Sequence, residues 1–361
     1  MNNFSARIIN WQRRNGRHSL PWQGEDPYRV WLSEIMLQQT QVATVIPYYQ
    51  RFVTSFPDIA ALAAATEDAV LAHWSGLGYY SRARNLHRAA KLIMQEHGGK
   101  FPRAFDDIMA LSGIGRSTAA AISALAFHER RAILDGNVKR VLARYCAIEG
   151  YPGYKRTEAQ LWRQAEALLP HSFPRPAGER GGVNDSIATY TQGLMDFGAT
   201  ICTRTKPDCD ICPVRKDCAA YLSGRVAQLP TPRPRKKLPE KHSTFLMLLN
   251  GCAILLEKRP ASGIWGGLWC PPQMESAENI SVYCMQHFGV DAKQVESLPE
   301  FAHTFTHFKL HIAPLLVQVT HNPGQVQEPG RRWLDREEAL RVAIPAPVRK
   351  LIEKIIYVEA L

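Results

Sequence analysis

The chain has 361 residues, of which 45% are hydrophobic and 21% charged, with a net charge of +11 and a pI near 9.3. This composition is typical of a two-domain globular protein, and it excludes collagen-like and low-complexity chains. The basic charge favours a polyanionic partner such as nucleic acid. No stretch approaches the roughly 18 apolar residues of a membrane span, and the N-terminus lacks a signal peptide's apolar segment. We therefore expect a cytoplasmic protein without membrane attachment, associated with the nucleoid if the source is bacterial.

The first part of the chain, up to about residue 222, shows helical periodicity. Apolar residues recur there at spacings of three and four, with Gly and Pro in the gaps. The predicted helices cover residues 29–46, 60–74, 83–96, 105–111, 117–126, 138–147 and 158–169. Residues 171–185, rich in Gly, Pro and charge, predict a long exposed loop. The pattern predicts an all-α domain over residues 1–224.

Glu34 lies within the first of these helices, on a face that also carries Val30, Trp31 and Leu37. A carboxylate on an apolar helix face is costly unless the protein uses it. Desolvation would raise its pKa and keep it protonated, as a general acid requires. The alternative is a glutamate that faces solvent, and the segment alone does not decide between the two.

A glycine hairpin opens the helix predicted at 117–126. Residues 111–119 read LSGIGRSTA, with Gly113 and Gly115 available for tight backbone conformations and close approach. The following helix N-terminus presents free N–H groups that can bind an anion. A single Gly-x-Gly is weak by itself, but beside a basic chain it favours a contact with phosphate.

Asp135 follows the apolar run at 132–134 and precedes a predicted helix. It is a candidate helix N-cap, which is the simplest role for an aspartate in this place. An N-cap can still direct its second oxygen into a cleft. From this segment alone, the cap is the favoured role of Asp135.

Four cysteines follow one another at metal-ligand spacing, C-x6-C-x2-C-x5-C. They are Cys202, Cys209, Cys212 and Cys218. Four soft thiolates suit Zn²⁺ or an iron–sulfur cluster, and the spacing does not separate the two. Lys and Arg residues are interspersed with them, which favours a rigid basic platform for a polyanion. We expect the remaining cysteines to be buried free thiols: Cys146, Cys252, Cys270 and Cys284.

The pattern changes after residue 224. Residues 225–242 alternate Pro with basic residues and predict a stiff basic linker. Period-two alternation then predicts strands at 244–249 and 252–257, joined by a turn at Asn250-Gly251. A later strand is predicted through residues 303–312, and a helix at 346–358. Residues 243–361 are thus predicted to form an α+β domain.

Five segments together carry a family resemblance. LSGIGRST resembles the helix-hairpin-helix motif, and the cysteine spacing matches the [4Fe–4S] loop of the endonuclease III and MutY branch. SEIMLQQTQV at 33–42, WSGLGYYSRARNL at 74–86 and ILDGNVKRVLAR at 133–144 closely resemble MutY-type adenine DNA glycosylases. The resemblance implies a helix-hairpin-helix glycosylase fold with the motif at about 109–130, a [4Fe–4S] loop at 202–218 and a C-terminal Nudix-like domain.

The resemblance also implies roles for particular residues. Glu34 would protonate adenine at N7, Asp135 would stabilise the positive charge on the sugar, and Asn137 would orient Asp135. The target base would be flipped out of the duplex. The residues implied to contact DNA are Gln39, Tyr79, Gly113, Gly115, Ser117 and Lys139.

Ser117 separates this chain from the bifunctional lyases of the superfamily, which carry a nucleophilic lysine at that place. Without an amine there, efficient Schiff-base formation with the sugar is not expected. In the second domain, Phe305, Thr306 and His307 match the loop implied to recognise 8-oxoguanine, with Thr306 in place of the usual serine. The acidic positions of a Nudix hydrolase fall on Gln273, Val282, Met285 and Gln286, so no nucleotide hydrolysis is expected.

The resemblance implies a monofunctional hydrolase that removes adenine mispaired with 8-oxoguanine or guanine in double-stranded DNA. It would hold a [4Fe–4S] cluster and act as a monomer. Three alternatives remain: an endonuclease III-like lyase, a non-catalytic DNA-binding protein with a structural cluster, and a hydrolase of free nucleotides. Ser117, the two carboxylates and the missing Nudix acids respectively argue against them.

Overall fold

A computed structural model describes residues 4–24, 26–170, 185–234, 237–274, 279–320 and 330–358. The chain divides into two compact units. We call Met1–Ala64 with Asn85–Arg235 the helical unit, and Ala65–Arg84 with Lys236–Leu361 the sheet unit. Residues 65–84 thus group with the C-terminal part of the chain. The loop predicted at 171–185 lies almost wholly outside the described residues.

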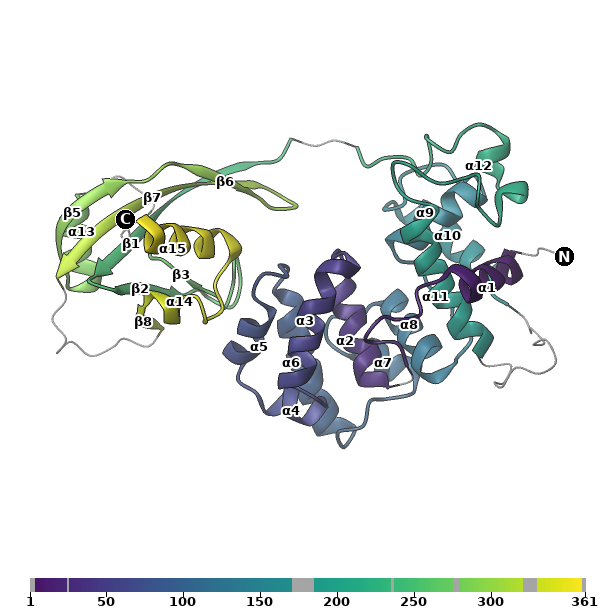
Figure 1. The fold of residues 1–361 in the computed structure, drawn as a ribbon, viewed down its shortest axis with the longest axis horizontal. Helices are drawn as coiled ribbons and strands as arrows, with labels where there is room; N and C mark the ends of the chain where they lie inside the picture. Colours follow the sequence, from purple (N-terminus) through teal and green to yellow (C-terminus); the bar gives the residue numbers. More distant parts are fainter. Residues whose placement is uncertain are drawn as a thin grey trace. The chain divides into compact units, whose positions relative to one another are not determined.

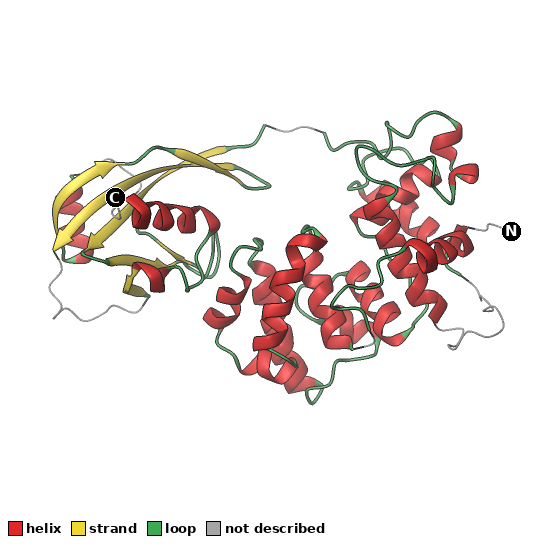
Figure 2. Ribbon diagram, viewed as in Figure 1, coloured by secondary structure: helices red, strands yellow, loops and turns green. Residues whose placement is uncertain are grey.

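The described part of the helical unit contains helices and no strands (Figures 1 and 2). They are α1 (Phe4–Asn15), α2 (Pro27–Leu37), α3 (Val42–Ser55), α4 (Ile59–Ala64), α6 (Ser81–Glu96, which begins in the sheet unit), α7 (Phe105–Ala110), α8 (Arg116–Phe127), α9 (Gly136–Tyr145), α10 (Lys155–Ala167), α11 (Asp185–Thr200), the 3-10 turn η1 (Arg215–Asp217) and α12 (Ala219–Leu222). The prediction of an all-α N-terminal part is confirmed.

Two predicted helices are each divided in the structure. Residues 29–46 form α2 and α3, because Gln39 adopts a left-handed backbone conformation with φ +57° between them. Residues 60–74 form α4 and, in the sheet unit, α5 (Glu67–Trp74). The side chain of Thr66 accepts the Ala69 N–H and thereby caps a new helix at that point.

Helices α1 and α11 were not predicted, although they pack on each other and share one apolar core. A Cβ on Gly193 of α11 would lie 3.0 Å from Gln12 Cβ and 3.0 Å from Ile8 Cγ2, so the two helices approach closely. Phe4, Ile8 and Ile9 are buried in the same apolar core as α8, α9 and α11. This packing places the chain that leaves α1 beside the polar face of α11.

The sheet unit is built on one mixed sheet of strand order β3-β2-β1-β7-β5, on which β4 pairs with β1, β6 with β7 and β8 with β2. The strands are β1 (Glu240–Asn250), β2 (Ala253–Lys258), β3 (Trp269–Cys270), β4 (Gln273–Met274), β5 (Asp291–Ser297), β6 (Phe301–Thr304), β7 (Lys309–Thr320) and β8 (Arg331–Asp335). The long strands β1 and β7 run parallel and side by side (Figure 1). The helices are α5, α13 (Ile280–Phe288), α14 (Arg336–Ala339) and α15 (Ala346–Val358), and α15 confirms the helix predicted at 346–358.

The hairpin prediction is correct in its pairing and wrong in its turn. Strands β1 and β2 pair in antiparallel register with Asn250 opposite Ala253, so Gly251 and Cys252 occupy the turn. Of these two, only Gly251 has a positive φ. A type I′ turn needs a positive φ at both central positions, so the turn is not the predicted type. Cys252 lies in this turn and is exposed, so the prediction that it is buried is wrong. Cys146 is half-buried, and Cys270 and Cys284 are buried as expected.

Two further predictions differ from the structure. Residues 303–312 are not one strand: they turn between β6 and β7, where Phe305 N donates to Phe308 O at 2.8 Å. The stiff linker predicted at 225–242 does contain the division between the two units, but both of its ends belong to folded structure. Glu240–His242 belong to β1, and Leu229 is buried against the helical unit.

Candidate active site

A cleft of about 1680 Å³ opens in the helical unit. Its walls come from the segment after α1, from α2 and the bend that follows it, from the starts of α8 and α9, and from α11. Glu34 and Asp135 both line it, although 101 residues separate them in the sequence. The fold therefore brings together the two carboxylates that the sequence identified.

Glu34 reaches the cleft from α2, a helix that the sequence starts firmly. Asp26 caps it by accepting the Tyr28 N–H at 3.0 Å, and Pro27 occupies the first helical position. Ser33, Ile35 and Met36 around Glu34 are buried. Burial raises the pKa of Glu34 to about 8, and the negative charge of Asp135 adds to the effect. The side chain is thus held in the protonated form of a general acid near neutral pH.

Asp135 is the N-cap of α9, as the sequence predicted. Its Oδ1 accepts the Val138 N–H at 2.7 Å. Burial raises the pKa of Asp135, while hydrogen bonds from the Val138 and Asn137 backbone and the charge of Arg140 act in the opposite direction. Glu34 has no such donors among the causes of its pKa shift. When the pair carries a single negative charge, that charge therefore belongs on Asp135.

Arg140 fixes Asn137, which lies two residues after Asp135 and also lines the cleft. Arg140 Nη2 donates to Asn137 Oδ1 at 2.9 Å and to Gly198 O at 2.6 Å, and Arg140 Nε donates to Cys202 O at 2.8 Å. The backbone of α11 approaches closely here, because a Cβ on Gly198 would lie 2.7 Å from Asn137 Cβ. One guanidinium therefore joins the start of α9, the end of α11 and the first of the four cysteines.

Ser117 supports the segment that carries Asp135. Its Oγ accepts the Leu134 N–H at 2.9 Å, one residue before Asp135, and the residue also lines the cleft. The hairpin ahead of it has φ +82° at Gly113, where a Cβ would lie 2.8 Å from Asn85 Cβ. Only glycine suits that position. Gly115 caps α8 in an extended conformation with open space around it.

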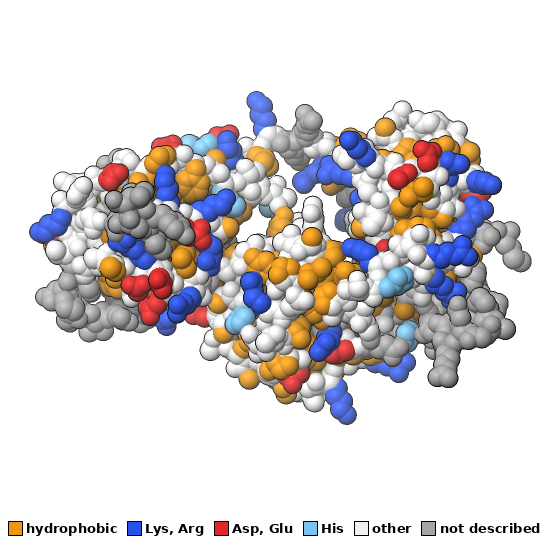
Figure 3. Space-filling model, viewed as in Figure 1, with side chains coloured by type: hydrophobic (Ala, Val, Ile, Leu, Met, Phe, Trp, Pro, Cys, Tyr) orange, Lys and Arg blue, Asp and Glu red, His pale blue; other side chains and the backbone are white. Residues whose placement is uncertain are grey.

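The remaining predicted DNA contacts of this unit differ in their placement. Gln39 lines the cleft and is exposed, with the strained left-handed backbone noted above. Lys139 is not among the described residues that line the cleft. Its Nζ instead pairs with Glu158 Oε1 of α10 at 2.6 Å. Basic side chains gather over the part of the helical unit that carries α1 and α12 (Figure 3).

The four cysteines line one small apolar cavity of about 30 Å³. Val141, Tyr145, Phe197 and Ile201 form much of its wall. Burial raises the pKa of Cys212 to about 12 and also raises that of Cys209 and Cys218. Within the described chain, no group of three or more His, Cys, Asp or Glu has the arrangement of a single-ion site. The four thiols therefore line one shared apolar space.

Arg144 ties this loop to the rest of the helical unit. Its side chain is almost fully buried and donates to four backbone carbonyls: Thr203 at 2.7 Å, Arg204 at 3.1 Å, Val226 at 3.1 Å and Leu229 at 2.8 Å. Its Nη1 also lies 3.4 Å from Cys202 Sγ. The sequence analysis did not single out Arg140 or Arg144. Both stand away from the apolar face that Val138, Val141 and Leu142 form on α9, so the helix pattern predicts exposed arginines and gives no sign of their buried contacts.

A second group of predicted residues lies in the sheet unit. Phe305, Thr306 and His307 form the turn between β6 and β7, where Thr306 and His307 are exposed. The Thr306 hydroxyl lies 3.4 Å from the Tyr79 hydroxyl. Tyr79 is 47% exposed and has a left-handed backbone with φ +48°. A side chain that is exposed and locally strained in this way is more typical of a binding residue than of the core.

Trp265 packs against the aromatic side chains of this turn. It is buried, and its ring packs against Phe305 at 5.5 Å and His303 at 5.8 Å between centroids. Phe305 in turn stacks on Phe308 at 4.5 Å. This aromatic packing holds the backbone of the turn in place.

In the described residues no helix is both long and apolar enough to cross a membrane. Residues 32–167 match the HhH-GPD superfamily of base excision DNA repair proteins, and residues 244–354 match the NUDIX domain. In solved structures, the chain resembles a thermostable thymine-DNA glycosylase with a TM-score of 0.52 and 29% identity, over 61% of this chain and 95% of that one.

Two full-length relatives extend the similarity across both units. The chain is 37% identical to the adenine DNA glycosylase of Buchnera aphidicola subsp. Acyrthosiphon pisum (strain APS), over 97% of each chain. It is 32% identical to the adenine DNA glycosylase of Homo sapiens, over 96% of this chain and 73% of that protein. Since both matches run through the helical and the sheet units, the chain belongs to the adenine DNA glycosylase family within the HhH-GPD superfamily.

Proposed function

We propose that this protein hydrolyses the N-glycosidic bond of adenine mispaired with 8-oxoguanine or guanine in double-stranded DNA, leaving an abasic site. The observation that carries the proposal is the carboxylate pair in the cleft. Burial holds Glu34 protonated to about pH 8, while hydrogen-bond donors and a guanidinium favour charge on Asp135. An acid and an anion in one cleft are what cleavage through an oxocarbenium-like sugar requires.

The mechanism follows from these protonation states. A flipped adenine enters the cleft, and Glu34 donates its proton to N7, so that the base leaves as a neutral group. The bond to the sugar then breaks, and the carboxylate of Asp135 stabilises the positive charge that develops there. The ionised Glu34 can take a proton from the water that attacks the sugar. Asn137, held by Arg140, keeps the end of Asp135 in place.

The same site supports a reaction without a lyase step. A lyase needs an amine that can attack the sugar, and Ser117 offers a hydroxyl that already accepts the Leu134 N–H. The described amine nearest in sequence to the two carboxylates is that of Lys139, which is paired with Glu158. Strand breaks should therefore appear only after alkali treatment.

The four cysteines would hold a [4Fe–4S] cluster. Four thiols that line one apolar cavity supply the soft donor set of such a cluster, and the family resemblance of the loop favours a cluster over zinc. When bound, the cluster would supply a rigid, electron-rich core to the loop. Its binding would require the thiols to lose their protons against the raised pKa values.

The sheet unit would read the base opposite adenine. Thr306 and His307 are exposed at the end of a β-hairpin, with Tyr79 beside them. Hydroxyl and imidazole groups can hydrogen-bond the added polar atoms of 8-oxoguanine. Gln39 and Tyr79 would enter the duplex where the adenine leaves it, since exposed side chains can occupy an unstacked step.

Single-turnover adenine release tests the proposal. The substrate is a duplex with one 8-oxoguanine:adenine pair, and the wild type is compared with Glu34→Gln. We expect adenine release by the wild type alone, with strand breaks mainly after hot alkali. No release would leave a non-catalytic DNA-binding protein, and breaks without alkali on a thymine-glycol duplex would indicate a lyase.

A further inference from the structure

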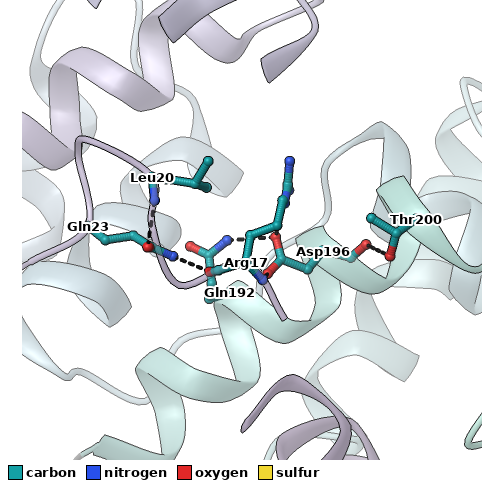
Figure 4. Close-up of polar contacts among 6 residues, drawn as sticks. All are labelled: Arg17, Leu20, Gln23, Gln192, Asp196 and Thr200. Carbon is teal, nitrogen blue, oxygen red and sulfur yellow. Dashed lines mark hydrogen bonds and ion pairs between the residues drawn. The ribbon is translucent and has the colours of Figure 1, made fainter. Parts of the chain in front are cut away.

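A buried carboxylate other than Glu34 and Asp135 is the centre of a polar cluster beside the cleft (Figure 4). Asp196 of α11 is fully buried. Its Oδ1 accepts from Arg17 Nε at 2.8 Å, Arg17 Nη2 at 2.6 Å and Gln192 Nε2 at 2.9 Å, and its Oδ2 accepts the Arg17 N–H at 2.9 Å. A buried charge is tolerated only when donors satisfy it in this way. Both the backbone and the side chain of Arg17 are thereby fixed.

Arg17 begins a short loop that a second polar side chain closes. Gln23 Nε2 donates to Arg17 O at 2.5 Å, and Gln23 Oε1 accepts the Leu20 N–H at 2.9 Å. The Gln23 N–H also donates to Leu20 O at 3.0 Å. One amide thus crosses the loop and joins its two ends (Figure 4). We refer to residues 17–24 as the anchored loop.

The packing of α1 on α11 determines where Asp196 meets Arg17. Gly193 allows the close approach of the two helices described above, and Asp196 lies three residues later on the same face of α11. Arg17 follows the last residue of α1 by two positions. Asp196 is therefore set against the first residues that leave α1, and the helix packing carries the loop with it.

The anchored loop is one wall of the cleft. Leu20, Trp22 and Gln23 line the cleft that Glu34 and Asp135 also line. Trp22 is buried with its ring edge-on to Tyr49, 5.3 Å between centroids, so the far end of the loop is also fixed by packing. A base bound in the cleft would contact this wall at the moment when Glu34 protonates the base.

We propose that Asp196 is a positioning residue for adenine excision: through Arg17 and Gln23 it holds the anchored loop as a rigid wall that makes the cleft selective for adenine among purines. The inference rests on the proposed glycosylase function. Asp196 is not among the residues that line the cleft and would not touch the substrate. Its effect would pass through the position of the loop, since small displacements of a positioning wall change rates strongly.

Two variants and one matched control test the proposal. Asp196→Asn keeps the shape but places an amide donor against the donors of Arg17. Gln23→Met keeps the length of the side chain and removes both bonds that close the loop, and it serves if Asp196→Asn does not fold. Glu149→Gln is the control, because it removes a carboxylate from an arginine pair of 2.6 Å, with Arg225, outside the cleft lining.

Three measurements distinguish positioning from general destabilisation. The first is the single-turnover rate of adenine release, and the second is the ratio of that rate to the rate for a purine lacking the 6-amino group. The third is hydrogen exchange at the backbone amides of residues 17–24 in DNA-free protein. In both variants we expect a rate lower by about 10- to 100-fold, a smaller adenine preference and faster loop exchange, with DNA affinity nearly unchanged. Glu149→Gln should change none of these.

The outcomes separate the two hypotheses. Variants with wild-type rates and a wild-type adenine preference would overturn the positioning role, as would unchanged exchange at residues 17–24. A lower rate with an unchanged adenine preference would also overturn it, since that result describes a merely structural residue. If the wild type releases no adenine while the variants loosen the loop, the glycosylase proposal fails and the anchoring by Asp196 stands.

Discussion

Arg140 Nη2 donates to Asn137 Oδ1 at 2.9 Å, and the same guanidinium donates through Nε to Cys202 O. Asn137, which would orient Asp135 in the proposed mechanism, is therefore held by the same guanidinium that holds Cys202, the first of the four cysteines. A change in the loop can reach the carboxylate pair through this one side chain.

Arg140→Lys should remove the hydrogen bonds that link the cysteine loop to Asn137. A lysine amine cannot make the three bonds of the planar guanidinium together, so Asn137 would lose its fixed orientation. We expect single-turnover adenine release to fall by about 10- to 100-fold. Glu149→Gln, which removes a surface pair with Arg225 at 2.6 Å outside the cysteine loop, is the control. Equal rates for Arg140→Lys and the wild type would contradict the link.

The rate of adenine release should depend on pH through Glu34. Glu34 is active when protonated and its pKa is about 8, so the rate should fall as pH rises through about 8. A profile of single-turnover rate between about pH 5 and pH 10 measures this limb. A rate that stays constant to pH 10 would show that Glu34 is not the acid.

The same shift has a consequence for stability. The pKa of Glu34 in the folded protein lies above its ordinary value, so its stabilising effect is complete below about pH 4.5 and is lost as pH rises through about 8. Glu34→Gln removes this dependence. We expect the variant to be more stable than the wild type by about 4 kcal/mol near pH 8 and similar near pH 4.5. Urea unfolding at the two pH values tests this, and a constant difference between the proteins would contradict it.

Two serines of α8 give a matched pair. Ser117→Ala leaves the Leu134 N–H without its acceptor and should cost about 1–2 kcal/mol of unfolding free energy, with slower adenine release. The Ser123 hydroxyl is buried and makes no hydrogen bond within the described residues. Ser123→Ala should therefore be neutral or slightly stabilising. Thermal unfolding of both variants decides the matter, and equal losses would refute the role given to Ser117.

Two glycines of the hairpin give a second pair. Gly113→Ala places a Cβ at φ +82° and against Asn85, and should cost about 2–3 kcal/mol of unfolding free energy. Gly115→Ala meets open space at φ −99° and should leave stability nearly unchanged. If its backbone lies against phosphate, the variant should still bind duplex DNA more weakly. Calorimetry and DNA titration measure the two effects separately, and equal stabilities would contradict the first expectation.

Each carboxylate has a local signal that leaves its role open, and the family resemblance of the surrounding segment supplies the role. Glu34 stands on an apolar helix face, and Asp135 stands where an apolar run meets a helix. Asp196 has no such signal, because its burial depends on the approach of α1 and on Arg17, which is 179 residues away. The bend at Gln39 was missed for a similar reason: a left-handed glutamine is imposed by its surroundings and not by its own preference.

The contacts of Arg144 limit where the chain can be cut without loss of folding. The donors of Arg144 are shared between the cysteine loop and the carbonyls of Val226 and Leu229, and the Gly150 N–H donates to Thr231 Oγ1. A fragment that ended soon after the cysteine loop would leave a buried guanidinium with unmet donors. A stable catalytic fragment should therefore extend beyond Thr231, so that the first part of the basic Pro-rich segment belongs to the minimal folding unit.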